Sequence, residues 1–195
     1  MPNTQTATTQ TQYFWSKFIT KTNVDLPDLP DLPDRYRSDD GSFLIGMAKE
    51  KAKSLFFKDK QASPEEWVTA ETIDGVIFAY PNVEGTVNIG NLKNYGSVPN
   101  MDAQAFGLIV SLIVYGHASF DSYKLNPQFS EVMGYNYSKL RTSFYEFIDA
   151  ALYPDAIAEN ADYETATRIA WFSELTIDQK AALDAMTRSI YSMTN

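Results

Sequence analysis

The stretch SVPNMDAQAFGLIVSLIVYGHASF, residues 97–120, decides how this chain folds. From Ala103 to Ala118 it is almost wholly apolar. Three polar side chains interrupt it: Gln104, Ser111 and His117. A helix that is apolar on every side is typical of the centre of a fold, and the run is shorter than the roughly 20 residues that a membrane span needs. We therefore expect a buried central helix over residues 101–117 and not a membrane span.

The composition is that of an ordinary soluble domain. The chain has 195 residues, of which 44% are hydrophobic and 21% charged, so a single domain is the expected organisation. It has no cysteine, which excludes disulfides and thiolate chemistry. The net charge of −9 argues against direct binding of nucleic acid, because phosphate contacts need lysine and arginine. That charge is compatible with a partner that has a basic face, and equally with simple solubility.

Two segments before the core have unusual composition. Residues 1–12 are polar and rich in threonine and glutamine; they lack the basic start and apolar run of a signal peptide, so we expect a disordered tail. Residues 24–37 contain Leu-Pro-Asp three times in succession. Proline favours extended backbone in itself and in its predecessor. The segment is predicted to be either a strap on the folded body or a proline-rich ligand for a partner domain. The single domain is expected over residues 13–195.

The middle of the chain alternates between helical and strand patterns. Apolar spacing predicts a helix over residues 42–60, and SPEEW at 63–67 has the pattern of a short helix start. Three short strand-like runs follow over residues 67–91, with Asp74-Gly75 as a hairpin turn. We expect these runs to form a three-stranded antiparallel meander.

Next come the expected start of the central helix and the later helices. Asn100 is the expected N-cap of that helix, with Asp102 in its first turn. Residues 126–153 are predicted to form one long helix, or two with a break near Gly134, and two further helices are expected after residue 155. The predicted fold class is α+β: a three-stranded antiparallel meander packed on a central apolar helix, with three or four surrounding helices. From residue 145 onwards nine acidic residues stand against three basic ones, so this helical part carries most of the negative charge.

The sequence contains no recognisable catalytic or metal-binding motif. His117, the one histidine, is the only group suited to acid–base work near neutral pH, but a lone histidine at the end of an apolar helix is more often a cap or a core group. One histidine without cysteine supplies no recognisable metal site. Neither a phosphate-binding glycine loop nor a nucleophile elbow occurs. We therefore expect no enzyme and no cofactor.

The order of motifs resembles a known family. A hairpin with DGVIFAYP is followed by a glycine-containing loop, a helix start with MDAQAFGL, and a helix with YSKLR that ends at YPD. The matching positions are Asp74, Gly75, Phe78, Pro81, Gly96, Met101, Asp102, Ala103, Ala105, Gly107, Leu112, Tyr137, Leu140, Arg141 and Tyr153 to Asp155. Over residues 67–162 this pattern resembles the antirestriction proteins of the ArdB/KlcA type. Gln104 and Phe106 stand where that family has small residues, and residues 163–195 form an added helical extension.

The resemblance implies a non-enzymatic anti-defence inhibitor carried by a phage, plasmid or other mobile genetic element. Such a protein would act in the cytoplasm of the bacterial host and block type I restriction–modification by binding a protein partner, such as the restriction enzyme, with no cofactor and without contact to nucleic acid or membrane. The partner-binding positions carried over from the family pattern are Asp74, Gly75, Gly96, Asp102 and Arg141. The alternative is a binding or structural protein of a phage or mobile element with an unknown partner, whose acidic surface would mimic DNA.

Overall fold

The computed structural model describes residues 15–25, 43–57, 63–90 and 97–152, together with 176–178, 180–181, 184–186 and 188. The elements in chain order are β1 (Ile19–Thr22), α2 (Phe43–Phe56), β2 (Trp67–Thr72), β3 (Ile77–Pro81), β4 (Thr86–Gly90), β5 (Ser97–Asp102), α3 (Ala103–Ser122) and α4 (Pro127–Leu152). The tail at 1–12, most of the strap at 24–37, Gly96 and the helix expected over 155–175 lie outside the described residues.

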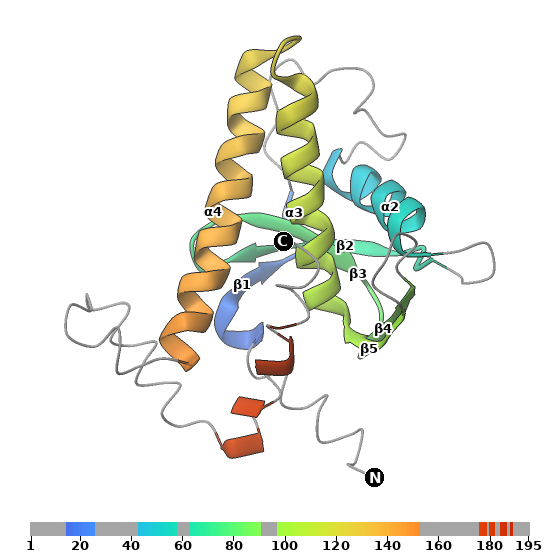
Figure 1. Cartoon of the computed structure of the whole chain (residues 1–195), viewed down its shortest axis with the longest axis vertical. Helices are drawn as coiled ribbons and strands as arrows, with labels where there is room; N and C mark the ends of the chain where they lie inside the picture. The colour runs from blue at the N-terminus through green and yellow to red at the C-terminus, as the bar shows by residue number, and fades with distance from the viewer. Residues whose placement is uncertain are drawn as a thin grey trace.

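The predicted α+β class is confirmed. β1, β2 and β3 form a three-stranded antiparallel sheet, and β4 pairs with β5 in a separate two-stranded sheet. The apolar helix α3 packs on β3 and lies between α2 and α4 (Figure 1). α3 and α4 run antiparallel, and the turn that joins them projects away from the sheets (Figure 1).

The membership of the three-stranded sheet differs from the predicted meander over 67–91. β4 leaves the sheet, and β1 takes the third place beside β2. The reason is that α3 already occupies the free edge of β3. Ser111 Oγ accepts a hydrogen bond from the Ala79 amide at 2.9 Å and donates one to the Ala79 carbonyl oxygen at 3.2 Å. Tyr115 donates its hydroxyl hydrogen to the Ile77 carbonyl oxygen at 2.7 Å.

These hydroxyl groups satisfy backbone groups that an edge strand would otherwise leave open. Ser111 and Tyr115 are four helical residues apart, about 6.0 Å along the axis, whereas Ile77 and Ala79 are two strand residues apart, about 6.6 Å. The two spacings are close enough for one helix stripe to follow one strand. Ser111, a polar interruption of the apolar run, is therefore part of the joint between helix and sheet.

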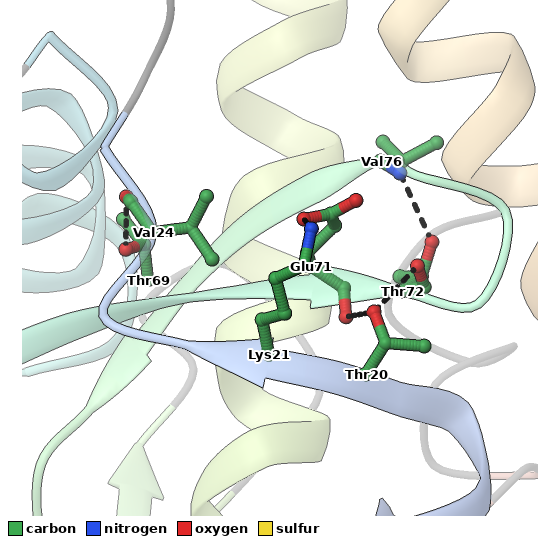
Figure 2. A network of polar contacts seen from close by, with 7 residues as sticks. All are labelled: Thr20, Lys21, Val24, Thr69, Glu71, Thr72 and Val76. Carbon is green, nitrogen blue, oxygen red and sulfur yellow. Dashed lines mark hydrogen bonds and ion pairs between the residues drawn. The ribbon is translucent and has the colours of Figure 1, made fainter.

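Polar contacts hold β1 on the opposite edge of β2 (Figure 2). The pairing register shifts between Ile19 and Lys21, and the intervening Thr20 donates its hydroxyl hydrogen to the carbonyl oxygens of Glu71 at 3.2 Å and Thr72 at 3.4 Å. Lys21 Nζ lies 2.9 Å from Glu71 Oε2. β1 is mostly exposed, so it lacks the alternating apolar pattern by which strands are recognised.

α3 is a core helix. Among the described residues it is the one helix long and apolar enough to cross a membrane. However, 67% of its apolar 18-residue segment is buried inside the protein. Its Phe106 is fully buried and contacts the rings of Phe56, Phe57 and Trp67, with centroids 5.4, 5.8 and 6.1 Å away. This burial is that of a central core helix, as the sequence predicts.

Three local expectations are settled by the backbone. The expected N-cap at Asn100 is wrong: this residue lies in β5 with φ of 57°, beside a register shift. Asp102 is the cap instead. Residues 63–66 form no helix; the Pro64 carbonyl oxygen accepts a hydrogen bond from Trp67 Nε1 at 3.0 Å. α4 runs through Gly134 as one helix, which selects the unbroken alternative.

Candidate functional site

The turn between β2 and β3 contains Asp74 and Gly75, two of the five partner-binding positions carried over from the family pattern, which we call the family-pattern positions. The Gly75 amide donates to the Thr72 carbonyl oxygen at 2.9 Å, and the Thr72 amide donates to the Val76 carbonyl oxygen at 2.8 Å. Gly75 has φ of 75°, a conformation that favours glycine and closes three-residue hairpin loops. The Asp-Gly pair thus forms the predicted hairpin turn, and this turn places Asp74 at one end of the sheet.

Asp74 faces the middle of α4 across a hollow of about 340 Å³. We call this surface the turn–α4 face; it is bordered by Asp74, Tyr135, Ser138, Lys139, Thr142 and Ser143. Arg141, a third family-pattern position, lies on the same stretch of α4 and is exposed. The structure therefore brings Asp74 and Gly75 to the middle of α4, which is 60 or more residues away in the sequence, whereas Arg141 does not border the hollow.

Two cations on this stretch of α4 are each stacked on an aromatic ring. Lys139 Nζ lies 5.5 Å from the centroid of the Tyr135 ring, and Arg141 Cζ lies 5.2 Å from that of Tyr145. Each pair is four residues apart, which places both members on one side of the helix. Cation–π contacts at exposed sites contribute about 0.5–1 kcal/mol, so their main effect is to hold the two positive groups in defined places.

The remaining family-pattern positions lie elsewhere. Asp102 caps α3: its Oδ1 accepts hydrogen bonds from the amides of Gln104 and Ala105, both at 3.0 Å. This role is structural, and a partner-binding role for Asp102 stays a prediction. Gly96 lies outside the described residues. His117 is exposed on α3. It borders neither the turn–α4 hollow nor the second, larger hollow, which lies at the turn between α3 and α4 and is described next.

A second surface was not predicted from the sequence. At the turn between α3 and α4, Phe120, Tyr123 and Leu125 are 85%, 71% and 75% exposed. We call these three residues the tip patch. They border a hollow of about 780 Å³ whose walls include Gly116, Ser119 and Gly134. The signal is visible in FDSYKLNP, residues 120–127, where large apolar residues continue beyond the apolar run into a turn that has charged residues on both sides.

The tip is held in a defined shape by hydrogen bonds. Ser119 and Ser130 each donate a hydroxyl hydrogen to the carbonyl oxygen of the other, at 3.0 and 2.7 Å. Asn126 Oδ1 accepts from the Phe129 amide at 3.1 Å and so caps α4, with Pro127 at the first helical position. The Asn126 amide in turn donates to the Ser122 carbonyl oxygen at 2.8 Å. The exposed rings therefore project from a fixed turn.

The two surfaces carry charged, hydroxyl and aromatic side chains. Among the described residues, no three histidine, aspartate or glutamate side chains gather to hold a metal ion. The one large pKa shift among these residues belongs to Tyr115, whose pKa is raised by burial and whose hydroxyl bonds to the backbone of β3. No protein-family model matches this chain, and no match was found among curated proteins or solved structures. The antirestriction resemblance therefore depends on the sequence pattern alone.

Proposed function

We propose that this protein is a non-enzymatic anti-defence inhibitor, carried by a phage or other mobile element, that blocks type I restriction by binding a protein of the restriction system. The observation that carries the proposal is the position of Asp74, which the β2–β3 turn holds against α4 across the turn–α4 hollow. Asp74 and Gly75, which the family pattern selects, form this turn, and Arg141, which it also selects, lies on the same stretch of α4.

The chemistry of the turn–α4 face supports a protein partner. The side chains bordering the hollow combine one carboxylate, one ammonium group, hydroxyl groups and an aromatic ring, and Arg141 adds a guanidinium group on the same stretch of α4, over the Tyr145 ring. Tyrosine and arginine are the residue types that most often dominate binding energy at protein interfaces. Opposite charges in fixed positions contribute specificity and orientation more than raw affinity.

The same face argues against DNA mimicry at this place. A mimic of DNA needs carboxylates repeated at the spacing of phosphates, one negative charge per about 1.7 Å of helix axis in the duplex. Asp74 is the only carboxylate among the residues that border the hollow, and Lys139 lies opposite it. The surface is therefore suited to a mixed-charge protein contact. An inhibitor of this kind acts where the restriction enzyme acts, in the cytoplasm of the bacterial host.

A plating assay tests the function. Unmodified phage is plated on a host with a type I restriction system, with and without expression of the protein; modified phage is plated in parallel to correct for effects on growth. We expect the protein to raise the plating efficiency of unmodified phage alone. Restriction as strong as in cells without the protein, although the protein is folded and abundant, would refute the proposal.

Matched variants connect the activity to the turn–α4 face. Asp74→Asn keeps a residue that suits the turn and removes the charge, and Arg141→Ala removes the guanidinium group. The controls are Glu84→Gln and Lys53→Ala, which remove the same charges from exposed positions outside this face. The double variant Asp74→Asn/Arg141→Ala is expected to lose most of the protection. If this variant and the double control Glu84→Gln/Lys53→Ala protect equally well, the turn–α4 face is not the binding surface.

A further inference from the structure

We infer that the α3–α4 tip is a homodimer surface, at which Phe120 of each copy enters the hollow beside the tip patch of the other. This inference goes beyond the proposed function and uses a different surface. A single exposed apolar side chain is ordinary, but a contiguous patch is not. Phe120, Tyr123 and Leu125 border one hollow and are all more than 70% exposed. Aromatic side chains present about 150–250 Å² each, so the patch reaches the roughly 300–600 Å² of the largest patches on monomers.

The tip carries both a projection and a recess. Phe120 is 85% exposed and projects beside the hollow of about 780 Å³. Gly116 and Gly134 are part of its wall, at places where α3 and α4 pack closely: a Cβ atom at Gly134 would lie 3.0 Å from Ser119 Oγ, and one at Gly116 would lie 3.5 Å from the Tyr137 ring. A two-fold interface uses the same patch on both subunits and must be complementary to itself. A surface with a projecting ring next to a space for a ring meets this requirement.

The charges at the tip fit the same partner. Asp121 and Lys124 both border the hollow, so a two-fold arrangement can bring Lys124 of each copy to Asp121 of the other. The local charge is therefore balanced, although each chain carries −9 overall. A strongly acidic or basic partner would find no matching charge here. A lipid surface would have to accommodate the Asp121 carboxylate between the inserted apolar side chains, which is costly.

The size of the surface sets the expected strength. Stable interfaces bury about 800 Å² per partner, roughly twice what the tip patch alone supplies. The hydrogen bonds between Ser119 and Ser130 fix the turn, which lowers the entropy lost on association. We expect a reversible dimer with a dissociation constant between roughly 1 µM and 1 mM, and not a permanent one.

Sedimentation velocity of the full chain over that concentration range tests the inference. The average mass is expected to rise from 22.0 kDa toward twice that value with concentration. Phe120→Ser should weaken association at least about tenfold, or 1.4 kcal/mol, without lowering the thermal stability, since the side chain is exposed. Ile177→Ser is the matched control, because Ile177 is also 85% exposed and does not border the tip hollow. It should leave association unchanged.

A charge exchange makes the test specific to the two-fold arrangement. Asp121→Lys and Lys124→Asp should each weaken the dimer, because each places like charges opposite one another. The double exchange Asp121→Lys/Lys124→Asp should restore association. A chain that stays monomeric over the whole range would overturn the inference, as would a dimer that Phe120→Ser leaves unchanged. Binding to phosphatidylcholine vesicles that depends on Phe120, without self-association, would also overturn it and would assign the tip to a lipid surface.

Discussion

Gly107 of α3 lies against Tyr80 of β3 so closely that a Cβ atom at position 107 would come within 2.1 Å of the Tyr80 Cβ atom. The same atom would lie 2.5 Å from the Ala79 carbonyl oxygen. Ser111 and Tyr115 follow Gly107 one and two turns later and bond to the backbone of Ala79 and Ile77. These three residues form the stripe by which α3 closes the edge of the sheet, and the absence of a side chain at position 107 permits the close approach.

Substitution of Gly107 should therefore destabilise the fold. Gly107→Ala places a methyl group against backbone atoms and Cβ, which cannot move without shifting the strand, so we expect a loss of about 1–3 kcal/mol or more in the free energy of unfolding. Gly116→Ala, on the same helix, is the control: its Cβ meets only the Tyr137 ring at 3.5 Å, and alanine gains about 1 kcal/mol in helix propensity. Chemical denaturation of both variants measures the difference. Equal stability of the two would contradict the close packing of helix and strand.

Removing the Ser111 hydroxyl should cost more than its size suggests. Ser111→Ala leaves the buried Ala79 amide without its partner on α3, and an unsatisfied buried donor costs about 1–3 kcal/mol. Ser54→Ala is the comparison, because Ser54 is exposed and also bonds to a backbone carbonyl oxygen, that of Lys51. Urea unfolding should show a clear loss for Ser111→Ala and a change within about 0.5 kcal/mol for Ser54→Ala. A loss no larger at Ser111 than at Ser54 would count against edge closure by α3.

Alkaline pH should destabilise the protein through Tyr115. Burial raises the pKa of Tyr115 well above its ordinary value of 10.0. Below pH 10 the tyrosine is protonated in both the folded and the unfolded chain, so the stabilisation is complete. Above pH 10 the unfolded chain releases the proton while the folded chain retains it. The free energy of unfolding therefore falls by about 1.4 kcal/mol per pH unit. Tyr115→Phe should be less stable by about 1 kcal/mol at neutral pH but should lose stability less steeply above pH 10. Tyr123→Phe, at an exposed position, should keep the wild-type slope.

The cap of α3 distinguishes Asp102 from Asn100. Asp102→Ala removes the acceptor of two amide hydrogens and should cost about 0.5–2 kcal/mol. Asn100→Gly should be tolerated or slightly stabilising, since φ at this position is 57° and glycine adopts such values more readily. Thermal melts of the two variants test this assignment. A larger loss of thermal stability for Asn100→Gly than for Asp102→Ala would favour Asn100 as the N-cap, as the sequence predicts.

Much of the fold follows from local patterns. The continuous apolar run predicts α3 because no other element could bury such a segment on every side, and Asp74-Gly75 predicts the β2–β3 hairpin because the turn chemistry is local. The partner of β4 could not be predicted in this way. It depends on Ser111 and Tyr115, which occupy the edge of β3 from more than 30 residues away in the sequence. A single hydroxyl group within an apolar run does not predict such a contact.

The candidate surfaces, too, follow partly from local sequence patterns and partly from contacts that only the fold creates. The family pattern selects Asp74 and Arg141 separately, but only the fold places the turn beside α4. The sequence does not separate the tip patch from the core, because Phe120 continues the apolar run of α3 and has the pattern of a core residue; the visible signal is the large apolar residues of FDSYKLNP, residues 120–127. The exposure of the tip patch follows from the position of the α3–α4 turn, which lies beyond the sheets and beyond α2 (Figure 1).

The central claim is that the turn–α4 face binds a protein of the restriction system, and calorimetric titration of the purified chain into a purified type I restriction enzyme tests it most directly. We predict saturable binding that Asp74→Asn/Arg141→Ala weakens at least about tenfold, whereas Glu84→Gln/Lys53→Ala binds as the wild type does. Absence of binding by the folded wild-type chain, or equal affinity of the two double variants, would contradict the account.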